Sequence, residues 1–225
     1  TAGVGSIAKM RKVKFVQGRA TLTGPKSLTV AGAAGETEVQ FEHLILATGS
    51  HPTKIPSLSI DSPRMMDSTS GLELPDVPTS LLVIGGGYIG LELGMVYAKL
   101  GSKVTVVEAL PSILASMDKD CVQVVARKLK KMGVEVMLKA KARSWEDKGD
   151  RAVLTVELEG GATATADTDV ILVSVGRRPN SEDLGLAEAG VAIDKRGYVL
   201  ADDQLRTNVP GIYALGDLIG GMMLA

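Results

Sequence analysis

An unbroken apolar run leads directly into a glycine-rich turn near the middle of this 225-residue chain. Leu81-Leu82-Val83-Ile84 has the pattern of a strand buried in a parallel sheet. It continues into Gly85-Gly86-Gly87-Tyr88-Ile89-Gly90, a G-x-G-x-x-G sequence, and residues 88–99 then follow a helical pattern. Strand, turn and helix in this order predict a dinucleotide-binding unit.

Each glycine of this turn has its own expected task. Gly85 allows the tight turn, Gly87 lets the backbone approach a pyrophosphate, and Gly90 lets the helix lie close to the strand. The first amides of the helix, which begins at Tyr88 and Ile89, and its dipole would face the phosphates. A glycine-rich β–α turn that binds nothing is the structural alternative.

An acidic residue follows the second apolar strand. Residues 104–107 are Val-Thr-Val-Val, and Glu108 comes about 20 residues after the glycines. In dinucleotide-binding units a carboxylate at this position accepts hydrogen bonds from the adenosine ribose hydroxyls. The 2′-phosphate of NADP would meet a like charge at Glu108. Gly90 in place of Ala, and the lack of an Arg directly after Glu108, also favour NAD as the cofactor.

The middle of the chain alternates between strands and helices, which predicts an α/β fold. We expect a Rossmann-like domain with a parallel sheet, helices and a small antiparallel meander covering its faces. The expected strands are 81–85, 104–107, 134–137 and 170–173. The expected helices are 88–99 and 118–132, and the meander is expected at 141–166.

The flanking segments show shorter strand patterns. Strands are expected at 13–16, 20–23 and 28–30, a polar connection at 31–38, a buried run at 41–47, a loop at 175–180 and a strand at 212–215. Several prolines precede the glycine-rich turn, which suggests a domain boundary within 67–78.

Composition excludes several functions. The formal net charge of −1 gives no support to nucleic-acid binding, and no apolar run has the length of a membrane span. Cys121 is the single cysteine, so no disulfide framework exists and a reducing, cytoplasmic location is expected. We expect Cys121 to pack beside the apolar stripe of its helix.

Four motifs occur in the order of one known family: Ala-Thr-Gly-Ser at 47–50, the glycine-rich stretch at 85–94, Val-Gly-Arg-Arg-Pro-Asn at 175–180 and Tyr-Ala-Leu-Gly-Asp at 213–217. The chain resembles the flavin-dependent pyridine-nucleotide–disulfide oxidoreductases, and within them most closely the dihydrolipoamide dehydrogenases. This resemblance implies an FAD-binding Rossmann-like domain interrupted by an NAD-binding domain. The implied parts are residues 1–70, 71–175 and 176–225.

The resemblance also implies roles for single residues. On the FAD side these are Thr48, Gly49, Asp217, Met223, Leu224 and Ala225, and on the nicotinamide side they are Tyr88 and Glu92. Gly176 is a further expected cofactor-binding residue. Structural alternatives stay open for several of them. Asp217 could cap a helix, residues 48–50 could be only a tight turn, Glu92 suits a helix start through the dipole alone, and Tyr88 could be a packed surface residue.

The implied activity is electron transfer from dihydrolipoamide, through an enzyme disulfide and FAD, to NAD. The partner would be dihydrolipoamide or the lipoyl domain of a 2-oxo acid dehydrogenase complex, and the enzyme would be a homodimer in the cytoplasm or, in a eukaryote, the mitochondrial matrix. The family's C-x4-C pair and His–Glu pair are not in these residues, so no catalytic residue is assigned and the chain is expected to be the central portion of a longer protein. A mercuric reductase, transhydrogenase or NADH oxidase of the same family, or a nucleotide-binding module without a redox centre, are the alternatives.

Overall fold

The computed structural model describes residues 2–58, 61–74 and 76–223. It divides into two compact units, Thr1–His51 with Arg178–Ala225 and, between them in the sequence, Pro52–Arg177. The chain crosses from one unit to the other at β5 (Ser50–Pro52) and β14 (Arg177–Pro179), which pair with each other. The domain boundaries expected from the sequence, 70/71 and 175/176, stay a prediction. β6 (Met65–Asp67), which precedes the first of them, belongs to the second compact unit and pairs there with another strand.

A five-stranded parallel sheet forms the centre of the second unit. Its strand order is β6-β13-β7-β8-β9, and each neighbouring pair runs parallel. The remaining strands of this sheet are β7 (Ser80–Ile84), β8 (Lys103–Val107), β9 (Glu135–Met137) and β13 (Val170–Val173). The expected α/β class is confirmed.

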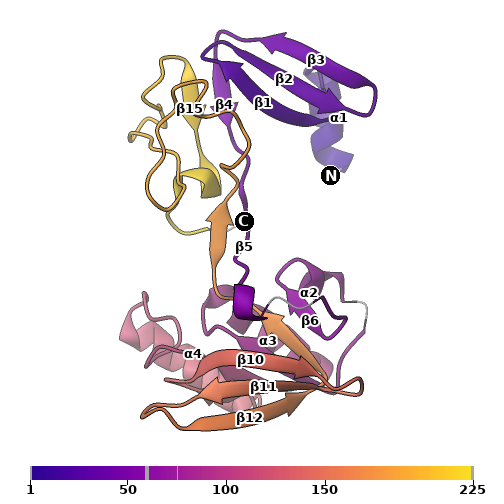
Figure 1. Ribbon diagram of the computed structural model, residues 1–225, viewed down its shortest axis with the longest axis vertical. Coiled ribbons are helices and arrows are strands. Elements are labelled where there is room, and N and C mark those ends of the chain that lie inside the picture. Colours follow the sequence, from indigo (N-terminus) through magenta and orange to yellow (C-terminus); the bar gives the residue numbers. More distant parts are fainter. Residues whose placement is uncertain (1, 59–60, 75, 224–225) are drawn as a thin grey trace. The chain divides into compact units, whose positions relative to one another are not determined.

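The two faces of this sheet are covered differently, as the alternation along β7 shows. Leu81 and Val83 pack in one core with α3 (Tyr88–Leu100) and α4 (Lys119–Lys131). Leu82 and Ile84 pack in another core against an antiparallel meander. Figure 1 shows the meander in orange, in front of the helices. Its strands are β10 (Lys141–Asp147), β11 (Ala152–Glu157) and β12 (Thr163–Thr168).

The first unit is built from short strands around a smaller core. Strands β1, β2 and β3 form an antiparallel sheet, and β4 pairs in parallel with β15. The elements of this unit are α1 (Ala2–Met10), β1 (Arg19–Gly24), β2 (Ser27–Gly32), β3 (Gly35–Gln40), β4 (Leu44–Leu46), β15 (Ile212–Ala214) and the 3-10 helix η2 (Gly216–Ile219). The short helices η1 (Pro56–Leu58) and α2 (Ser70–Glu73) belong to the second unit.

Some local expectations were wrong. Residues 13–17 have no regular structure, and Phe15 is 82% exposed, because apolar alternation makes a strand only where a neighbour offers backbone partners. The polar stretch 31–38, expected as a connection, instead contains the end of β2 and the start of β3 (Gly35–Gln40), and these two strands pair with each other. Residues 177–179, expected in a loop, form β14. Cys121 is exposed rather than packed.

Tyr97 connects α3 to α2. Its ring is fully buried, and its hydroxyl donates a hydrogen bond of 2.8 Å to the carbonyl oxygen of Gly71. Burial raises the pKa of the Tyr97 phenol. The hydroxyl therefore stays neutral and available as a donor well into the alkaline range.

Tyr97→Phe should lower the free energy of unfolding of the second unit by about 1–2 kcal/mol, because a buried carbonyl loses its partner. Urea unfolding followed by circular dichroism measures the change. Tyr198→Phe, in the other unit, removes a hydroxyl that has no hydrogen bond among the described residues and serves as the control. Equal losses for the two variants would contradict a specific role for the Tyr97 bond.

Candidate functional site

The turn after β7 is tight on two sides. Gly85 has a φ of +110°, and a Cβ added there would lie 2.3 Å from the carbonyl oxygen of Ser174. The N–H of Gly85 donates to the carbonyl oxygen of Val107 at 2.9 Å. A Cβ at Gly90 would lie 2.3 Å from the carbonyl oxygen of Gly85. Both positions therefore need glycine for the turn itself.

Gly87 differs from its neighbours in the turn. It caps α3 with a φ of −78° and a ψ of 175°, and nothing lies within 4 Å of a Cβ placed on it. The N–H of Leu91 makes the first helical bond, 3.0 Å long, to the carbonyl of Gly87, so α3 begins directly at this glycine. Open space therefore lies beside the start of α3.

The carboxylate of Glu108 is held in place by two backbone amides. Its Oε2 accepts a hydrogen bond of 2.6 Å from the N–H of Gly86, and its Oε1 accepts one of 2.7 Å from the N–H of Leu110. Glu108 comes directly after β8, so the carboxyl ends of β7 and β8 bring this acid and the glycine-rich turn together. Each oxygen keeps a further lone pair for a ligand hydroxyl.

A cavity of about 730 Å³ lies along this edge of the sheet. Four residues expected at a cofactor site line it: Gly85, Gly87, Glu108 and Gly176. The other lining residues come from η1 and the residue before it, the ends of β7 and β8, the residues after β8 and β13, and the start of the meander: Ile55, Ser57, Ile84, Val107, Ala109, Leu110, Ala140, Lys141, Ala142, Arg143, Ser174 and Val175.

The remaining predicted residues of this unit lie at the first turns of α3 and are not among those lining the cavity. Tyr88 and Ile89 are half-buried, Gly90 is buried, and Glu92 is exposed. The structure therefore brings Glu108, Gly87 and Gly176 together around one space, and leaves Glu92 on the helix surface.

The predicted residues of the first unit lie at a loop braced by Asn180. The Thr48 hydroxyl donates to the backbone carbonyl of Asn180 at 2.7 Å, and the Asn180 side-chain amide donates to the carbonyl of Thr48 at 2.8 Å. Gly49 has a φ of +70°. The Ser50 hydroxyl donates to Oδ2 of Asp217. Thr48, Gly49 and Asp217 thus share one hydrogen-bonded region.

Asp217 lies inside η2 and does not cap it, so the capping alternative for this residue was wrong. Met223 is half-buried. Leu224 and Ala225 lie outside the described residues.

Several residues at these sites were not identified from the sequence. His51 contributes Nδ1 at 2.7 Å from Oδ1 of Asn180. His51 was not assigned to a site, and Asn180 was noted only as the last residue of the motif at 175–180. Lys141 and Arg143 belong to Lys139-Ala140-Lys141-Ala142-Arg143, where basic and small residues alternate. That period of two is typical of a strand with one basic face, and it was the available signal.

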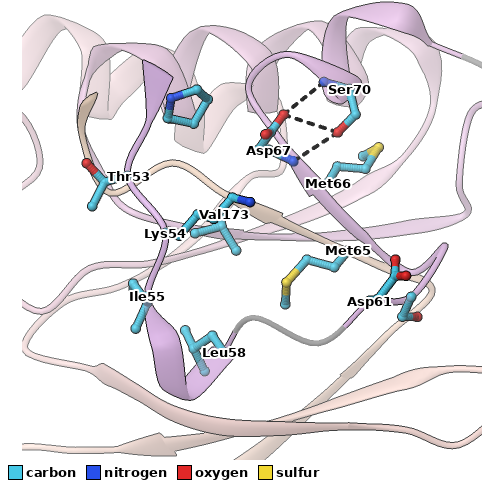
Figure 2. Close-up of a pocket in the computed structure, with 12 residues that line it drawn as sticks. Thr53, Lys54, Ile55, Leu58, Asp61, Met65, Met66, Asp67, Ser70 and Val173 are labelled. Carbon is cyan, nitrogen blue, oxygen red and sulfur yellow. Dashed lines mark hydrogen bonds between the residues drawn. The ribbon is translucent and has the colours of Figure 1, made fainter. Parts of the chain in front are cut away.

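A second cavity, of about 460 Å³, lies in the same unit at the carboxyl ends of β6 and β13. Figure 2 shows it, with Asp67 turned toward Ser70 and joined to it by hydrogen bonds. Its walls are part apolar and part polar, with Ile55, Leu58, Met65, Met66 and Val173 beside Lys54, Asp61 and Asp67. No sequence motif pointed to this cavity.

Within the described residues, no group of three or more His, Cys, Asp or Glu side chains could hold a metal ion. Nor does any helix in these ranges combine the length and the apolar character that crossing a membrane requires.

Comparison with known proteins places these features in a family. The model of the pyridine nucleotide-disulphide oxidoreductases matches residues 1–225. The chain is 42% identical over its whole length to dihydrolipoyl dehydrogenases of Vibrio cholerae and Geobacillus stearothermophilus, covering 47% of each. It is 43% identical to the mitochondrial dihydrolipoyl dehydrogenase 1 of Arabidopsis thaliana, covering 45% of it. The chain thus spans about half the length of these curated relatives.

Solved structures agree with this assignment. The flavoprotein disulfide reductase RclA of Escherichia coli, in its Cu(II) complex, superimposes with a TM-score of 0.87 at 32% identity, over 96% of this chain and 48% of RclA. LpdA of Mycobacterium tuberculosis gives a TM-score of 0.89 at 28% identity, over 99% of this chain and 49% of LpdA. The chain belongs to the pyridine nucleotide-disulphide oxidoreductases.

Proposed function

We propose that the protein is an NAD-dependent dihydrolipoyl dehydrogenase, a flavoprotein that passes electrons from dihydrolipoamide, through an enzyme disulfide and FAD, to NAD⁺. The observation that carries the proposal is the cavity lined by Gly85, Gly87 and Glu108, in a chain 42% identical to dihydrolipoyl dehydrogenases. The disulfide and the acid–base pair would come from outside these residues. Dihydrolipoamide, or a lipoyl domain of a 2-oxo acid dehydrogenase complex, is the proposed partner.

The second unit is the proposed NAD-binding part. Gly87 leaves open space where a side chain would block a pyrophosphate, and the dipole of α3 favours negative charge at the start of the helix. Tyr88, Ile89 and Gly90, in the first turn of α3, are proposed cofactor contacts through the family resemblance. Glu108 would accept hydrogen bonds from the ribose hydroxyls. Glu92 is assigned to the nicotinamide side through the family resemblance, and Gly176, which lines the cavity, is a further proposed cofactor contact.

The first unit is proposed to hold part of FAD. The donor set fits a polar cofactor chain, because Asp217 and Thr48 both belong to the hydrogen-bonded region around residues 48–50. Gly49 and the segment Met223 to Ala225 are proposed contacts through the resemblance. When bound, FAD would supply the electron transfer between the enzyme disulfide and NAD⁺. A homodimer, located in the cytoplasm or the mitochondrial matrix, completes the proposal.

The decisive test is reduction of NAD⁺ by dihydrolipoamide in the full-length protein, with NADP⁺ as the control cofactor. We expect activity with NAD⁺ and little with NADP⁺. The likeness to RclA favours one alternative, another flavin disulfide reductase of the family. If the protein bound flavin and oxidised NADH but did not act on dihydrolipoamide, the alternative function would be supported instead.

Glu108→Ala should weaken NAD⁺ binding about 5- to 20-fold, because the ribose hydroxyls lose a charged acceptor worth roughly 1–2 kcal/mol. It should also improve NADP⁺ binding, since the repulsion of the 2′-phosphate disappears. Isothermal titration of both cofactors measures the two effects. Glu135→Ala, on β9 and outside the cavity, is the control for loss of an acid in this unit. An unchanged preference would remove Glu108 from the cofactor site.

A further inference from the structure

Three charged residues line the cavity beside the glycine-rich turn: Glu108, Lys141 and Arg143. Lys141 and Arg143 lie at the start of β10 with one residue between them. Ala140 and Ala142 pack into the core beneath the meander. Ala140 lies next to Glu108, because its N–H donates to the backbone carbonyl of Glu108 at 2.9 Å. The basic face of β10 therefore begins beside the acid that follows β8.

Of the basic side chains at the start of the meander, Lys141 is not used in an ion pair among the described residues. Lys139 donates to both carboxylate oxygens of Glu159, at 2.7 and 2.9 Å. Arg143 donates through Nε to Oε2 of Glu157 at 2.6 Å. Lys141 stands opposite Glu157 in the strand register, but that carboxylate is already paired with Arg143. Among the described residues, Lys141 has no ion-pair partner.

Glu108 does not neutralise Lys141 either, since no ion pair joins the two in the described part of the chain. The Glu108 carboxylate is instead bound by the amides of Gly86 and Leu110. Two amides that converge on a carboxylate form a small anion site, and here a side chain of the protein fills it. The surplus cation lies on the wall of the same cavity.

We propose that Lys141 and the amides of Gly86 and Leu110 form a latent site for a 2′-phosphate. In the parent protein the Glu108 carboxylate occupies this site, and NADP is therefore excluded. The proposal rests on the proposed function, since it assumes that the dinucleotide occupies this cavity. It deepens that function by assigning cofactor choice to two residues of opposite charge. Glu108 rejects the 2′-phosphate, and Lys141 would attract it once the carboxylate is gone.

The test compares NAD⁺ and NADP⁺ binding to the full-length protein by isothermal titration, because the two cofactors differ only in the 2′-phosphate. Four proteins are needed: the parent protein, Glu108→Ala, Glu108→Ala/Lys141→Met and Glu108→Ala/Lys139→Met. The two lysine substitutions remove the same charge from neighbouring positions, but Lys139 is paired with Glu159 and does not line the cavity. Circular dichroism checks that each variant is folded.

With Glu108→Ala in place, Lys141→Met should weaken NADP⁺ binding about 5-fold and NAD⁺ binding less than about 2-fold, as expected for one partly exposed ion pair with a phosphate. Lys139→Met should change both affinities less than about 2-fold. Equal losses of NAD⁺ and NADP⁺ with Lys141→Met, or equal effects of the two lysine variants, would overturn the role of Lys141. Absence of NAD⁺ binding to the parent protein would instead overturn the proposed function.

Discussion

Gly87→Val should abolish dinucleotide binding while leaving the fold intact. The backbone of Gly87 is extended, with a φ of −78° and a ψ of 175°, which a β-branched residue adopts without strain. No atom lies within 4 Å of an added Cβ, so the valine side chain would occupy only the space proposed for the pyrophosphate. We expect NAD⁺ affinity to fall about 100-fold or more, because a rigid turn cannot make room for the added atoms.

Thermal unfolding and isothermal titration with NAD⁺ together test this expectation. The free energy of unfolding should change by less than about 0.5 kcal/mol, as for other sites without packing contacts. Gly24→Val, at a glycine of the first unit that also has room for a side chain, is the control and should leave NAD⁺ binding unchanged. If Gly87→Val still bound NAD⁺ normally, the pyrophosphate could not lie at this turn.

Gly90→Ala should destabilise the second unit, although alanine is the better helix former. Its Cβ would lie 2.3 Å from the carbonyl oxygen of Gly85 and 3.1 Å from Cγ1 of Val83. Helix and strand would have to move apart, and overpacking of this kind costs about 1–3 kcal/mol. We expect a net loss near the upper end of that range, because a backbone oxygen cannot rotate away as a side chain can.

Gly94→Ala provides a matched control in the same helix. A Cβ there would make ordinary contacts of 3.5 Å with Val104 and Val83, and alanine gains about 1 kcal/mol over glycine in a helix interior. Urea unfolding should therefore show a loss for Gly90→Ala and a gain for Gly94→Ala. Two changes of the same sign would show that helix propensity, rather than close approach to the strand, decides the outcome.

The sequence predicted the second unit better than the first, for a physical reason. Strands buried on both faces, such as β7 and β8, and the amphipathic α4 leave strong local patterns. β3 is polar and forms by pairing with β2, the strand before it in the chain. β14 is only three residues long and forms by pairing with β5, which is distant in the chain. No local pattern in their own residues indicates that pairing.

The candidate site divides in the same way. Glycines that a turn requires, and an acid at the end of a strand, can be found from their spacing, as Gly85, Gly90 and Glu108 were. The hydrogen bonds of Asn180 and the unpaired state of Lys141 depend on which carboxylates and carbonyls the fold places nearby. Such relations are properties of the folded chain and cannot be derived from one segment alone.

The first and last residues of the second unit lie side by side. The N–H of Thr53 donates to the carbonyl oxygen of Gly176 at 2.9 Å, so the whole stretch between them is a loop closed at its base by backbone hydrogen bonding. Because the entropic cost of a closed loop depends only weakly on its length, such an insert can grow, shrink or be exchanged with little effect on the protein that carries it. The second unit, which is the proposed nucleotide-binding part, is therefore connected to the rest of the chain through two peptide segments that lie side by side.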